Sequence, residues 1–443
     1  MRTKVRAERL LIEKLTDGYL ALMLSVFLLW PGTDGYARIT AAKYRLFLIL
    51  TLGYCAGTAL LYLELLAMRQ LRPVPFRELI RAVRPAEWLM LGYVLCSLLS
   101  SLLSPWRADT WLGLTRREGF LTLALYAAVF LLLGRLARPK KWMFDVFGTG
   151  MSLCCLLALW QLAGGNPLGL YPESLSYYDA GKAYSGAYLG TIGNTDLLAA
   201  VMCVAVPVFF YGAWRLRRFW LFMPMALCMI VSVRMDVSAG LLGIAAGLIL
   251  PLPLAFSGKK RRAAAIVIGT GLLAAFLAVL LLPELPGMLG EVHEVLHGRA
   301  KDEFGSGRIY IWKNVWQAVK ERPLLGGGPD TLSRRITAYF ERFDEARNAV
   351  LRTGIDAAHN EYLNILANQG IFALLCWLGA LGCSAVRFFR CAGERSAVLI
   401  CGSAVLGYCV QAFFGISMCL STPFLLIAWA MLENRESERK PAK

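Results

Sequence analysis

The sequence predicts an all-α integral membrane protein, and three observations support that prediction. Hydrophobic residues make up 57% of the 443 residues, and the mean hydropathy is +0.54. Charged residues make up only 17%, against roughly 25% in a soluble domain. The apolar residues gather in runs of about 20, the length of a helix that crosses the hydrocarbon core of a bilayer. A membrane β-barrel would alternate apolar and polar residues, and these runs do not alternate.

The order of the apolar runs divides the chain into three parts. Residues 1–282 form an N-terminal transmembrane bundle of about nine spans. Residues 283–361 form one long polar stretch, which we expect to be a helical outer loop. Residues 362–443 hold three more spans and a charged cytoplasmic tail. The twelve expected spans cover residues 19–30, 44–68, 88–103, 120–136, 142–163, 195–213, 219–233, 237–256, 263–282, 362–386, 398–414 and 422–432.

The net charge of +17 reports on membrane topology. In a soluble protein this charge would suggest a nucleic-acid partner. Here the basic residues lie in short clusters between apolar runs, which is the pattern of cytoplasmic loops. With the N-terminus inside, the cytoplasmic segments hold 28 of the 47 Lys and Arg residues. We therefore expect both termini in the cytoplasm, attraction to anionic membrane lipids and no nucleic-acid partner.

Within the long polar stretch, Arg308 lies at the start of an amphipathic helix. Ser306 is a plausible N-cap, and Pro323 ends the helical pattern. A cation in the first turn opposes the helix dipole at a cost of a few tenths of a kcal/mol, whereas an anion there is favoured. An anionic ligand of Arg308 would explain this placement. The alternative is an ion pair within the loop, for instance with Asp302 or Glu303.

A triple-glycine turn, Gly326, Gly327 and Gly328, follows this helix and continues as Pro-Asp. Glycine allows positive φ and close approach of another backbone. The turn resembles a phosphate-binding loop but lacks the Gly-Lys-Ser/Thr of a nucleotide site. The glycines alone favour a tight turn between helices, and we expect Asp330 to cap a helix over residues 331–343.

His359 lies where the chain returns to apolar sequence. We expect Asp356 to be the N-cap of the tenth span, which places His359 near the outer mouth of that helix. A histidine at the membrane surface can accept a proton near neutral pH. The alternative is a hydrogen-bonded interface histidine. Polar side chains that enter a span are costly unless they are paired or face a cavity, and this helix begins with four, at Asn360, Asn364, Asn368 and Gln369.

Arg234 is another isolated charge at the expected outer surface, between the seventh and eighth spans. It would either extend to lipid headgroups or contact a substrate. The sequence shows no cluster with metal-ligand spacing and no Ser/His/Asp order, so we expect no metal and no cofactor.

Two blocks, SGRIYIWKNVWQAVKERPLLGGGPDTL and HNEYLNILANQGIFALL, resemble the superfamily of O-antigen ligases and Wzy-type polymerases, which are bacterial membrane glycosyltransferases. IGNTDLLAA, which contains Asn194, looks like a further family stretch. The resemblance implies a GT-C-type helical architecture in the bacterial inner membrane. It also implies a donor glycan linked to undecaprenyl diphosphate and a saccharide or lipid acceptor.

The resemblance also assigns roles to residues. Arg308 matches the arginine that binds the donor diphosphate, and His359 matches the base that activates the acceptor hydroxyl. It implies a metal-independent, inverting single displacement in which arginines neutralise the leaving group. We expect Asn194, Asn360 and the three glycines to support the site.

The chain departs from the family pattern at the start of the eighth span. Relatives often carry Ser-Arg-Gly there, and this chain reads Ser238-Ala239-Gly240. Arg234 lies four residues before Ser238, about one turn away on a continuous helix, and is our candidate for the missing second cation.

The sequence leaves three functions open. The first is a glycosyltransferase, either a ligase or a polymerase. These two differ only in the acceptor, which the two sequence blocks do not identify. A flippase or transporter of lipid-linked saccharides is the competing class, although few charges lie in the middle of spans to form a pathway. A non-catalytic membrane protein of the same fold is the third.

Overall fold

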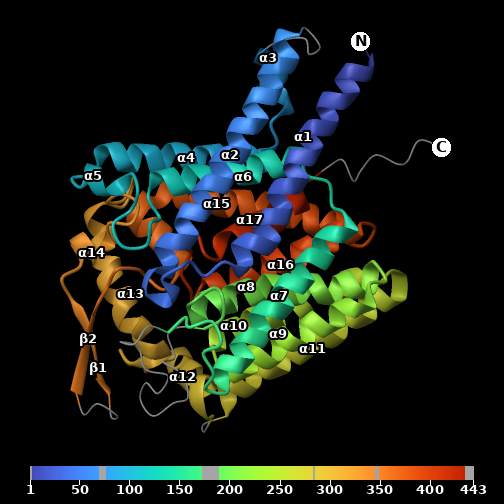
Figure 1. Cartoon of the computed structure of the whole chain (residues 1–443). Coiled ribbons are helices and arrows are strands. Elements are labelled where there is room, and N and C mark those ends of the chain that lie inside the picture. Colours follow the sequence, from blue (N-terminus) through green and yellow to red (C-terminus); the bar gives the residue numbers. More distant parts are fainter. Residues whose placement is uncertain (1, 69–75, 172–188, 283–284, 345–348, 435–443) are drawn as a thin grey trace.

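Helices make up most of the molecule, as the sequence predicts (Figure 1). This computed structural model describes residues 2–68, 76–171, 189–282, 285–344 and 349–434. The start of the predicted outer loop at 283–284 and the predicted tail at 435–443 lie outside the described residues.

Seven helices in this part of the chain are long and apolar enough to cross a membrane. The chain is therefore a helical integral membrane protein. The seven are α2 (Ile39–Ala67), α4 (Pro85–Leu103), α7 (Lys141–Leu162), α8 (Thr195–Arg215), α10 (Ser238–Ile249, with the turn to Ala255), α11 (Gly258–Leu281) and α15 (Glu361–Cys391).

Five further helices overlap the remaining predicted spans, although the first of them begins well before residue 19. They are α1 (Arg2–Leu22, continued by a π turn over Met23–Phe27), α6 (Phe120–Leu136), α9 (Phe222–Met235), α16 (Ser396–Ala412) and α17 (Thr422–Glu433). Apart from α1, these helices have 12 to 17 residues, and at 1.5 Å per residue they cover roughly 18–26 Å, less than the roughly 30 Å of a hydrocarbon core. The number of crossings, twelve by our prediction, therefore stays a prediction.

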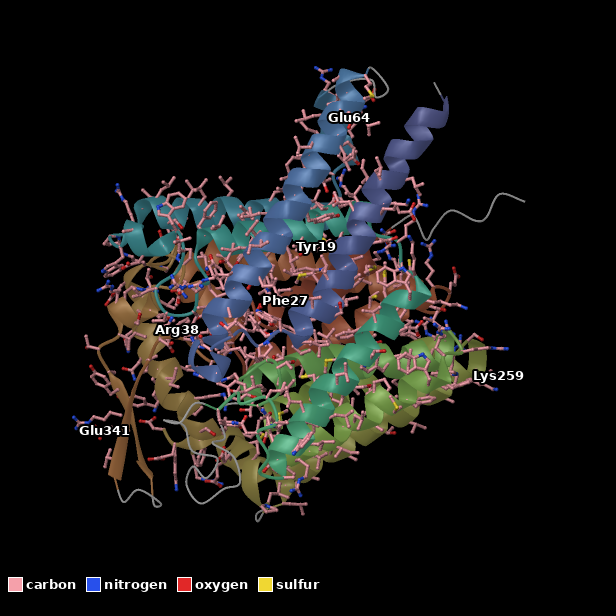
Figure 2. The ribbon with its side chains drawn as sticks, in the orientation of Figure 1. Tyr19, Phe27, Arg38, Glu64, Lys259 and Glu341 are labelled. Carbon is pink, nitrogen blue, oxygen red and sulfur yellow. The ribbon has the colours of Figure 1, made fainter. Side chains whose placement is uncertain are left out.

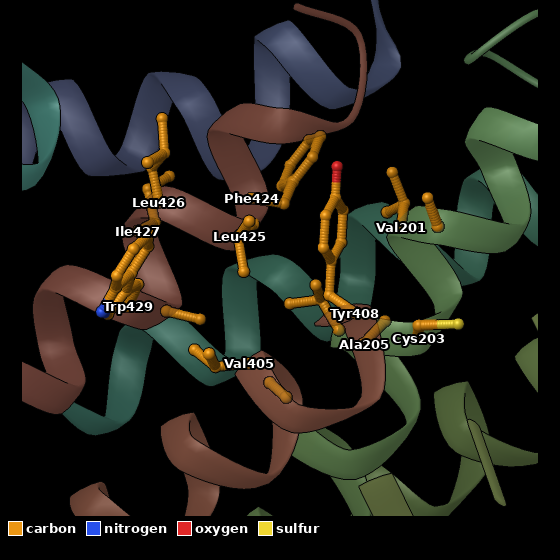
Figure 3. Packing of buried hydrophobic residues seen from close by; sticks show 14 of the residues in the cluster. Val201, Cys203, Ala205, Val405, Tyr408, Phe424, Leu425, Leu426, Ile427 and Trp429 are labelled. Atoms are coloured by element: carbon orange, nitrogen blue, oxygen red, sulfur yellow. The ribbon is translucent and has the colours of Figure 1, made fainter. Parts of the chain in front are cut away.

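Helix α8 is the centre of the bundle. In its membrane-length segment 89% of the residues are buried, whereas the corresponding segment of α11 has none, so α11 is peripheral. Val201 and Ala205 of α8 lie beside Tyr408 of α16, and Trp429 of α17 belongs to the same apolar cluster (Figure 3). Close packing of this kind holds membrane helices together, because lipid chains provide no hydrophobic drive between them.

Helix α15 is broken at Gly370, which has φ 85° and ψ 178°. Pro323 and Leu324, which follow α13, pack against the break. Ile371 donates its N–H to the carbonyl oxygen of Pro323 at 2.9 Å. An added Cβ at Gly370 would overlap the carbonyl group of Leu324. Glycine is thus required by both its conformation and its surroundings, and the break fixes the position of the polar start of α15.

We predict that Gly370→Ala destabilises the protein, because alanine would be strained at this φ and would displace the chain at Leu324. A loss of about 2–4 kcal/mol is expected from strain and overpacking together. Thermal unfolding followed by gel filtration in detergent measures the effect. Gly382→Ala is the matched control, because an added Cβ there meets nothing within 4 Å and the helix is regular. Equal melting temperatures for the two variants would contradict the prediction.

The long polar stretch contains α12 (Gly287–Leu296), α13 (Phe304–Glu321) and α14 (Leu332–Arg335), followed by a β-hairpin of β1 (Tyr339–Asp344) and β2 (Ala349–Gly354). The hairpin is antiparallel, with Tyr339 opposite Gly354. The prediction of a helix over 331–343 is wrong beyond Arg335, and the hairpin is an exception in an otherwise helical chain. Residues 339–343 and 349–353 are rich in aromatic and β-branched side chains, which favour a paired strand over a solvent-exposed helix.

The bundle has two distinct ends. The start of α1 and α3 (Phe76–Ala82) lie at the top of Figure 1, and α12, α13, α14 and the hairpin lie at the left and lower left. Arg38 lies on the α13 side of the molecule, whereas Glu64 and Lys259 lie at the far ends of their helices (Figure 2). The long polar stretch that carries Arg308 is thus gathered on the side away from the start of α1.

Candidate functional site

Five segments that are distant in sequence meet beside the start of α13. They are the loop at 115–118 after α5 (Arg107–Thr110), the start of α8, the start of α13, residues 356–360 before α15, and the turn at 413–418 between α16 and α17. Arg116, Asp196, Arg308 and Asp356 all act on the pKa of His359, and Phe414 accepts a hydrogen bond from Arg308. The site is therefore assembled from both parts of the bundle and from the long polar stretch.

Arg308 lies in the first regular turn of α13, as predicted. Gly305, Ser306 and Gly307 before it have φ of 62°, 59° and 83°, so the regular helix begins after them. The Arg308 guanidinium donates to the carbonyl oxygen of Phe414 from Nε (3.1 Å) and to that of Gly305 from Nη1 (2.7 Å). Two carbonyl groups therefore orient the side chain.

The predicted capping role of Ser306 is wrong, since its left-handed backbone conformation places it in the turn before the helix. The alternative of a loop ion pair for Arg308 also fails for Asp302, whose carboxylate binds Lys313 at 2.6 Å. Burial lowers the pKa of the Arg308 guanidinium, and the carboxylates of Asp196 and Glu291 oppose this effect. Arginine remains charged in proteins, so Arg308 is a half-buried cation.

His359 lies just before α15 in a left-handed conformation, with φ 47°. The predicted cap, Asp356, is wrong. Asn360 is the N-cap, and its side chain accepts the N–H of Leu363 at 3.0 Å. The preceding carbonyl group, at Ala358, accepts the indole N–H of Trp312 at 3.0 Å. Both neighbours of His359 are thereby fixed, which is how the structure maintains an uncommon backbone conformation.

The electrostatic surroundings of His359 keep it neutral. Burial lowers its pKa to about 4, and the nearby cations Arg116 and Arg308 act in the same direction. The carboxylates of Asp196 and Asp356 only partly offset this effect. Among the described residues, the imidazole has no hydrogen-bond partner, so the alternative of a hydrogen-bonded interface histidine finds no support. At neutral pH His359 is a free base.

Arg116 is the cation near His359 that sequence reasoning missed. Its Nη2 donates to Asp356 Oδ1 at 2.8 Å, and the two side chains are 19% and 32% exposed. The pair connects the 115–118 loop to the segment that carries His359. The signal in the sequence is the pair Arg116-Arg117 in the short segment between the third and fourth expected spans.

Asp330 holds the 115–118 loop in place. Its carboxylate accepts the backbone N–H groups of Thr115 (3.0 Å) and Arg116 (2.9 Å), and Thr115 Oγ1 donates to it at 3.0 Å. Burial raises the pKa of Asp330, while these donors favour its charged form. Its φ is 56°, and it does not cap α14, contrary to prediction. Asp330 instead connects the glycine turn to the Arg116 loop.

The glycine turn fastens the long polar stretch to α15. The N–H groups of Gly326, Gly327 and Gly328 donate to the carbonyl oxygens of Arg322 (3.0 Å), Ala367 (3.2 Å) and Asn368 (2.8 Å). None of these three N–H groups is free to bind a phosphate. The turn is therefore structural, as the glycines alone indicated. Close approach of the two backbones requires glycine, because an added Cβ at Gly326 would overlap Asn368.

Two cavities flank the site. The first, which we call the apolar groove, has a volume of about 330 Å³ and is lined by residues of α10, α12 and α13 and by Phe413 and Phe414. Arg308 and Glu291 are its charged residues. The second, which we call the outer pocket, has a volume of about 480 Å³. Arg38, Arg116, Arg117, Asn194 and Asp356 are among its lining residues.

A third, smaller cavity of about 30 Å³ shares Arg116 and Asp356 with the outer pocket. This volume has room for one or two water molecules. Glu118 and Glu361 line it and are 9% and 3% exposed. Tyr126 donates to Glu118 at 2.7 Å, and burial raises the pKa of Glu118 well above its ordinary value. The Arg116–Asp356 pair thus separates the outer pocket from a protected acidic interior.

Arg234 is exposed at the end of α9 and is not among the lining residues of the groove or the outer pocket. The chain does not continue as one helix to Ser238, since Asp236 has φ 53° and α10 begins anew at Ser238. Ser238 and Ala239 do line the apolar groove with Arg308. An arginine at position 239, where relatives carry one, would therefore line the groove together with Arg308. Arg234 does not reach that position.

Asn194 is the N-cap of α8, and its side chain accepts the N–H of Leu197 at 3.0 Å. It also lines the outer pocket. Among the described residues there is no cluster of three or more His, Cys, Asp or Glu side chains arranged to hold a metal ion.

Comparison with known proteins identifies one related region. Residues 236–378 match a family model described as O-antigen ligase. The match includes Arg308, the glycine turn and His359, and it confirms the resemblance seen in the sequence. Arg116 and Asn194 lie outside it. No match was found among curated proteins.

Proposed function

Because residues 236–378 carry the O-antigen ligase domain, we propose that this protein is a membrane glycosyltransferase of the ligase or polymerase type. It moves a glycan from undecaprenyl diphosphate to a hydroxyl group of a saccharide or lipid acceptor. The reaction takes place at the outer face of the bacterial inner membrane, in surface polysaccharide biosynthesis. The observation that carries the proposal is the free base His359, near Arg308 of the apolar groove and Arg116 of the outer pocket.

The apolar groove suits a prenyl diphosphate donor. Its lining is almost wholly apolar, which matches an isoprenoid chain, and Arg308 supplies a cation among these apolar residues. A guanidinium matches the paired oxygens of a diphosphate. The Arg308 side chain is already oriented by two carbonyl groups. Donor binding thus needs little rearrangement of this residue.

The chemistry is a single displacement. The acceptor oxygen attacks the anomeric carbon, and the bond from that carbon to the diphosphate oxygen breaks. His359 takes the proton of the acceptor hydroxyl, and the released electron pair stays on the lipid diphosphate. Arg308 stabilises the negative charge as it develops there. Attack opposite the leaving group inverts the anomeric centre, and the arginines take the neutralising role that other transferases give to a metal.

We predict an unusually acidic limit for activity. A base whose pKa is about 4 is neutral above that pH and loses its function as the pH falls through it. The value of kcat/KM, which reports on the free enzyme, should stay flat from pH 8 to about 5 and fall below. Arg116→Gln should move this limit to higher pH, since loss of a neighbouring cation stabilises the imidazolium. A limit near the ordinary histidine value of 6.5 in both proteins would contradict the assignment.

Two arginines are candidates for the second cation of the donor site. Arg234 was suggested by the sequence, and Arg116 is placed beside His359 by the structure. We propose that Arg116 has this role and predict that Arg116→Gln weakens donor binding about tenfold, as expected for a charge-assisted hydrogen bond. Arg234→Gln should leave it unchanged. Titration of undecaprenyl diphosphate into the purified variants decides the question, and the reverse order of effects would assign the role to Arg234.

The glycan profile of a deletion strain tests the function as a whole. Loss of a ligase leaves completed chains that are not attached to their anchor. Loss of a polymerase leaves single repeat units. An unchanged profile in the deletion strain, with normal surface attachment, would contradict the proposal, and repeats trapped at the inner face would favour a flippase.

A further inference from the structure

The outer pocket contains two arginines, Arg38 and Arg117, that the proposed donor site does not use. Among the described residues, three arginines line it, at Arg38, Arg116 and Arg117, against one carboxylate, that of Asp356. Asp356 is already bound to Arg116 at 2.8 Å. The nearest acid to Arg38 is Asp34 at 3.9 Å, and both side chains are more than half exposed, so that pair is weak. Within the part of the chain that the structure describes, Arg38 and Arg117 therefore give the pocket about two positive charges that no close carboxylate offsets.

Arg117 is held in place by its neighbours. It has φ 61°, a conformation that costs a non-glycine residue about 1 kcal/mol or more. Its carbonyl oxygen accepts the hydroxyl of Thr122 at 2.6 Å. Asp330 fixes the residues before it, and Glu118 is buried beside Tyr126. Strain that is maintained from both sides is typical of functional positions, and here it fixes the backbone that carries an exposed guanidinium.

The pocket has the size and composition of a small-ligand site. A volume of about 480 Å³ lies within the range of ligand pockets and has room for one or two sugar units. Thr40, Asn194 and Tyr36 add polar and aromatic surface beside the arginines. Asp356 connects the pocket to His359, three residues further along the chain. A ligand in the pocket would therefore contact the segment that carries the proposed base.

We propose that the outer pocket binds an acceptor saccharide that carries a carboxylate or phosphate group, recognised by Arg38 and Arg117. This inference rests on the proposed glycosyltransferase function and adds the chemical class of the acceptor. Guanidinium forks bind planar carboxylates and phosphates in a paired geometry that neutral sugars cannot reproduce. The enzyme would thus select acidic glycans over neutral ones.

Binding to the full-length protein in phosphatidylcholine nanodiscs tests the proposal. The probes are two matched pairs, hyaluronan tetrasaccharide against chitotetraose and trehalose 6-phosphate against trehalose. We expect at least one acidic member to bind at least tenfold more tightly than its neutral partner. Arg38→Gln and Arg117→Gln should each weaken that binding about tenfold. Arg107→Gln is the control, an exposed arginine on α5 that does not line the pocket.

The outcomes separate this inference from the function on which it rests. Binding of the acidic probe should persist in His359→Ala, because that residue acts in catalysis. Equal affinities within both pairs, or no effect of Arg38→Gln and Arg117→Gln, would overturn the inference. Stronger, Arg117-dependent binding of dihexanoyl phosphatidylglycerol would assign the pocket to a lipid headgroup and also overturn it. In either case, donor binding and transfer that depend on Arg308 and His359 would leave the proposed function standing.

Discussion

Replacement of His359 by alanine is expected to lower glycan transfer by about 10²–10⁴-fold, the usual contribution of a general base. The imidazole is free of hydrogen bonds among the described residues and is neutral at pH 7, so it is ready to accept a proton. Donor binding should change little, because Arg308 and the apolar groove do not depend on it. Transfer is measured with a synthetic lipid-linked glycan, and binding with undecaprenyl diphosphate.

His297→Ala serves as the control for His359→Ala. His297 is an exposed histidine just after α12. Among the described residues, its ring forms one hydrogen bond, with the carbonyl oxygen of His293. That variant should transfer glycan at the normal rate. Normal surface polymer in cells that carry His359→Ala would refute the catalytic assignment.

Loss of the Arg308 guanidinium is expected to have the second largest effect. Removing one group that stabilises developing negative charge costs about 10²–10³-fold in rate. Arg308→Ala should therefore lower kcat and also raise KM, because the same cation contacts the diphosphate before and during the reaction. Arg308→Lys keeps the charge but loses the paired geometry, so it should recover only part of the activity.

Lys313→Ala is the matched control for Arg308 on the same helix. Lys313 forms an exposed ion pair with Asp302, and exposed pairs contribute little to stability. Its loss should leave both kcat and KM unchanged. Equal effects of Arg308→Ala and Lys313→Ala would indicate that α13 matters only through its net charge.

Much of the helical framework could be predicted from the sequence. Apolar runs of membrane length are a strong signal, since backbone groups in lipid must bond within the chain. The positions of Arg308 and His359 at helix starts also follow from the local pattern. For both residues the details of the caps differ, because Ser306 and His359 adopt left-handed conformations that tertiary contacts maintain.

Contacts between distant segments could not be predicted. The Arg116–Asp356 pair joins residues that are 240 positions apart, and the bonds from Asp330 to the 115–118 loop span more than 200. A single sequence carries no record of such pairs. The break of the chain at Asp236 likewise depends on packing, and it interrupts the continuous helix on which Arg234 would lie one turn before Ser238.

The most direct test of the account is the stoichiometry of the reaction. Purified protein in nanodiscs is incubated with a synthetic undecaprenyl-diphosphate-linked glycan and an acceptor, and both products are quantified by mass spectrometry. We expect one undecaprenyl diphosphate for each new glycosidic bond, of inverted configuration, with the wild-type protein and almost none with His359→Ala. Product formed equally by both proteins, or no product from the wild type with any acceptor tested, would contradict the account.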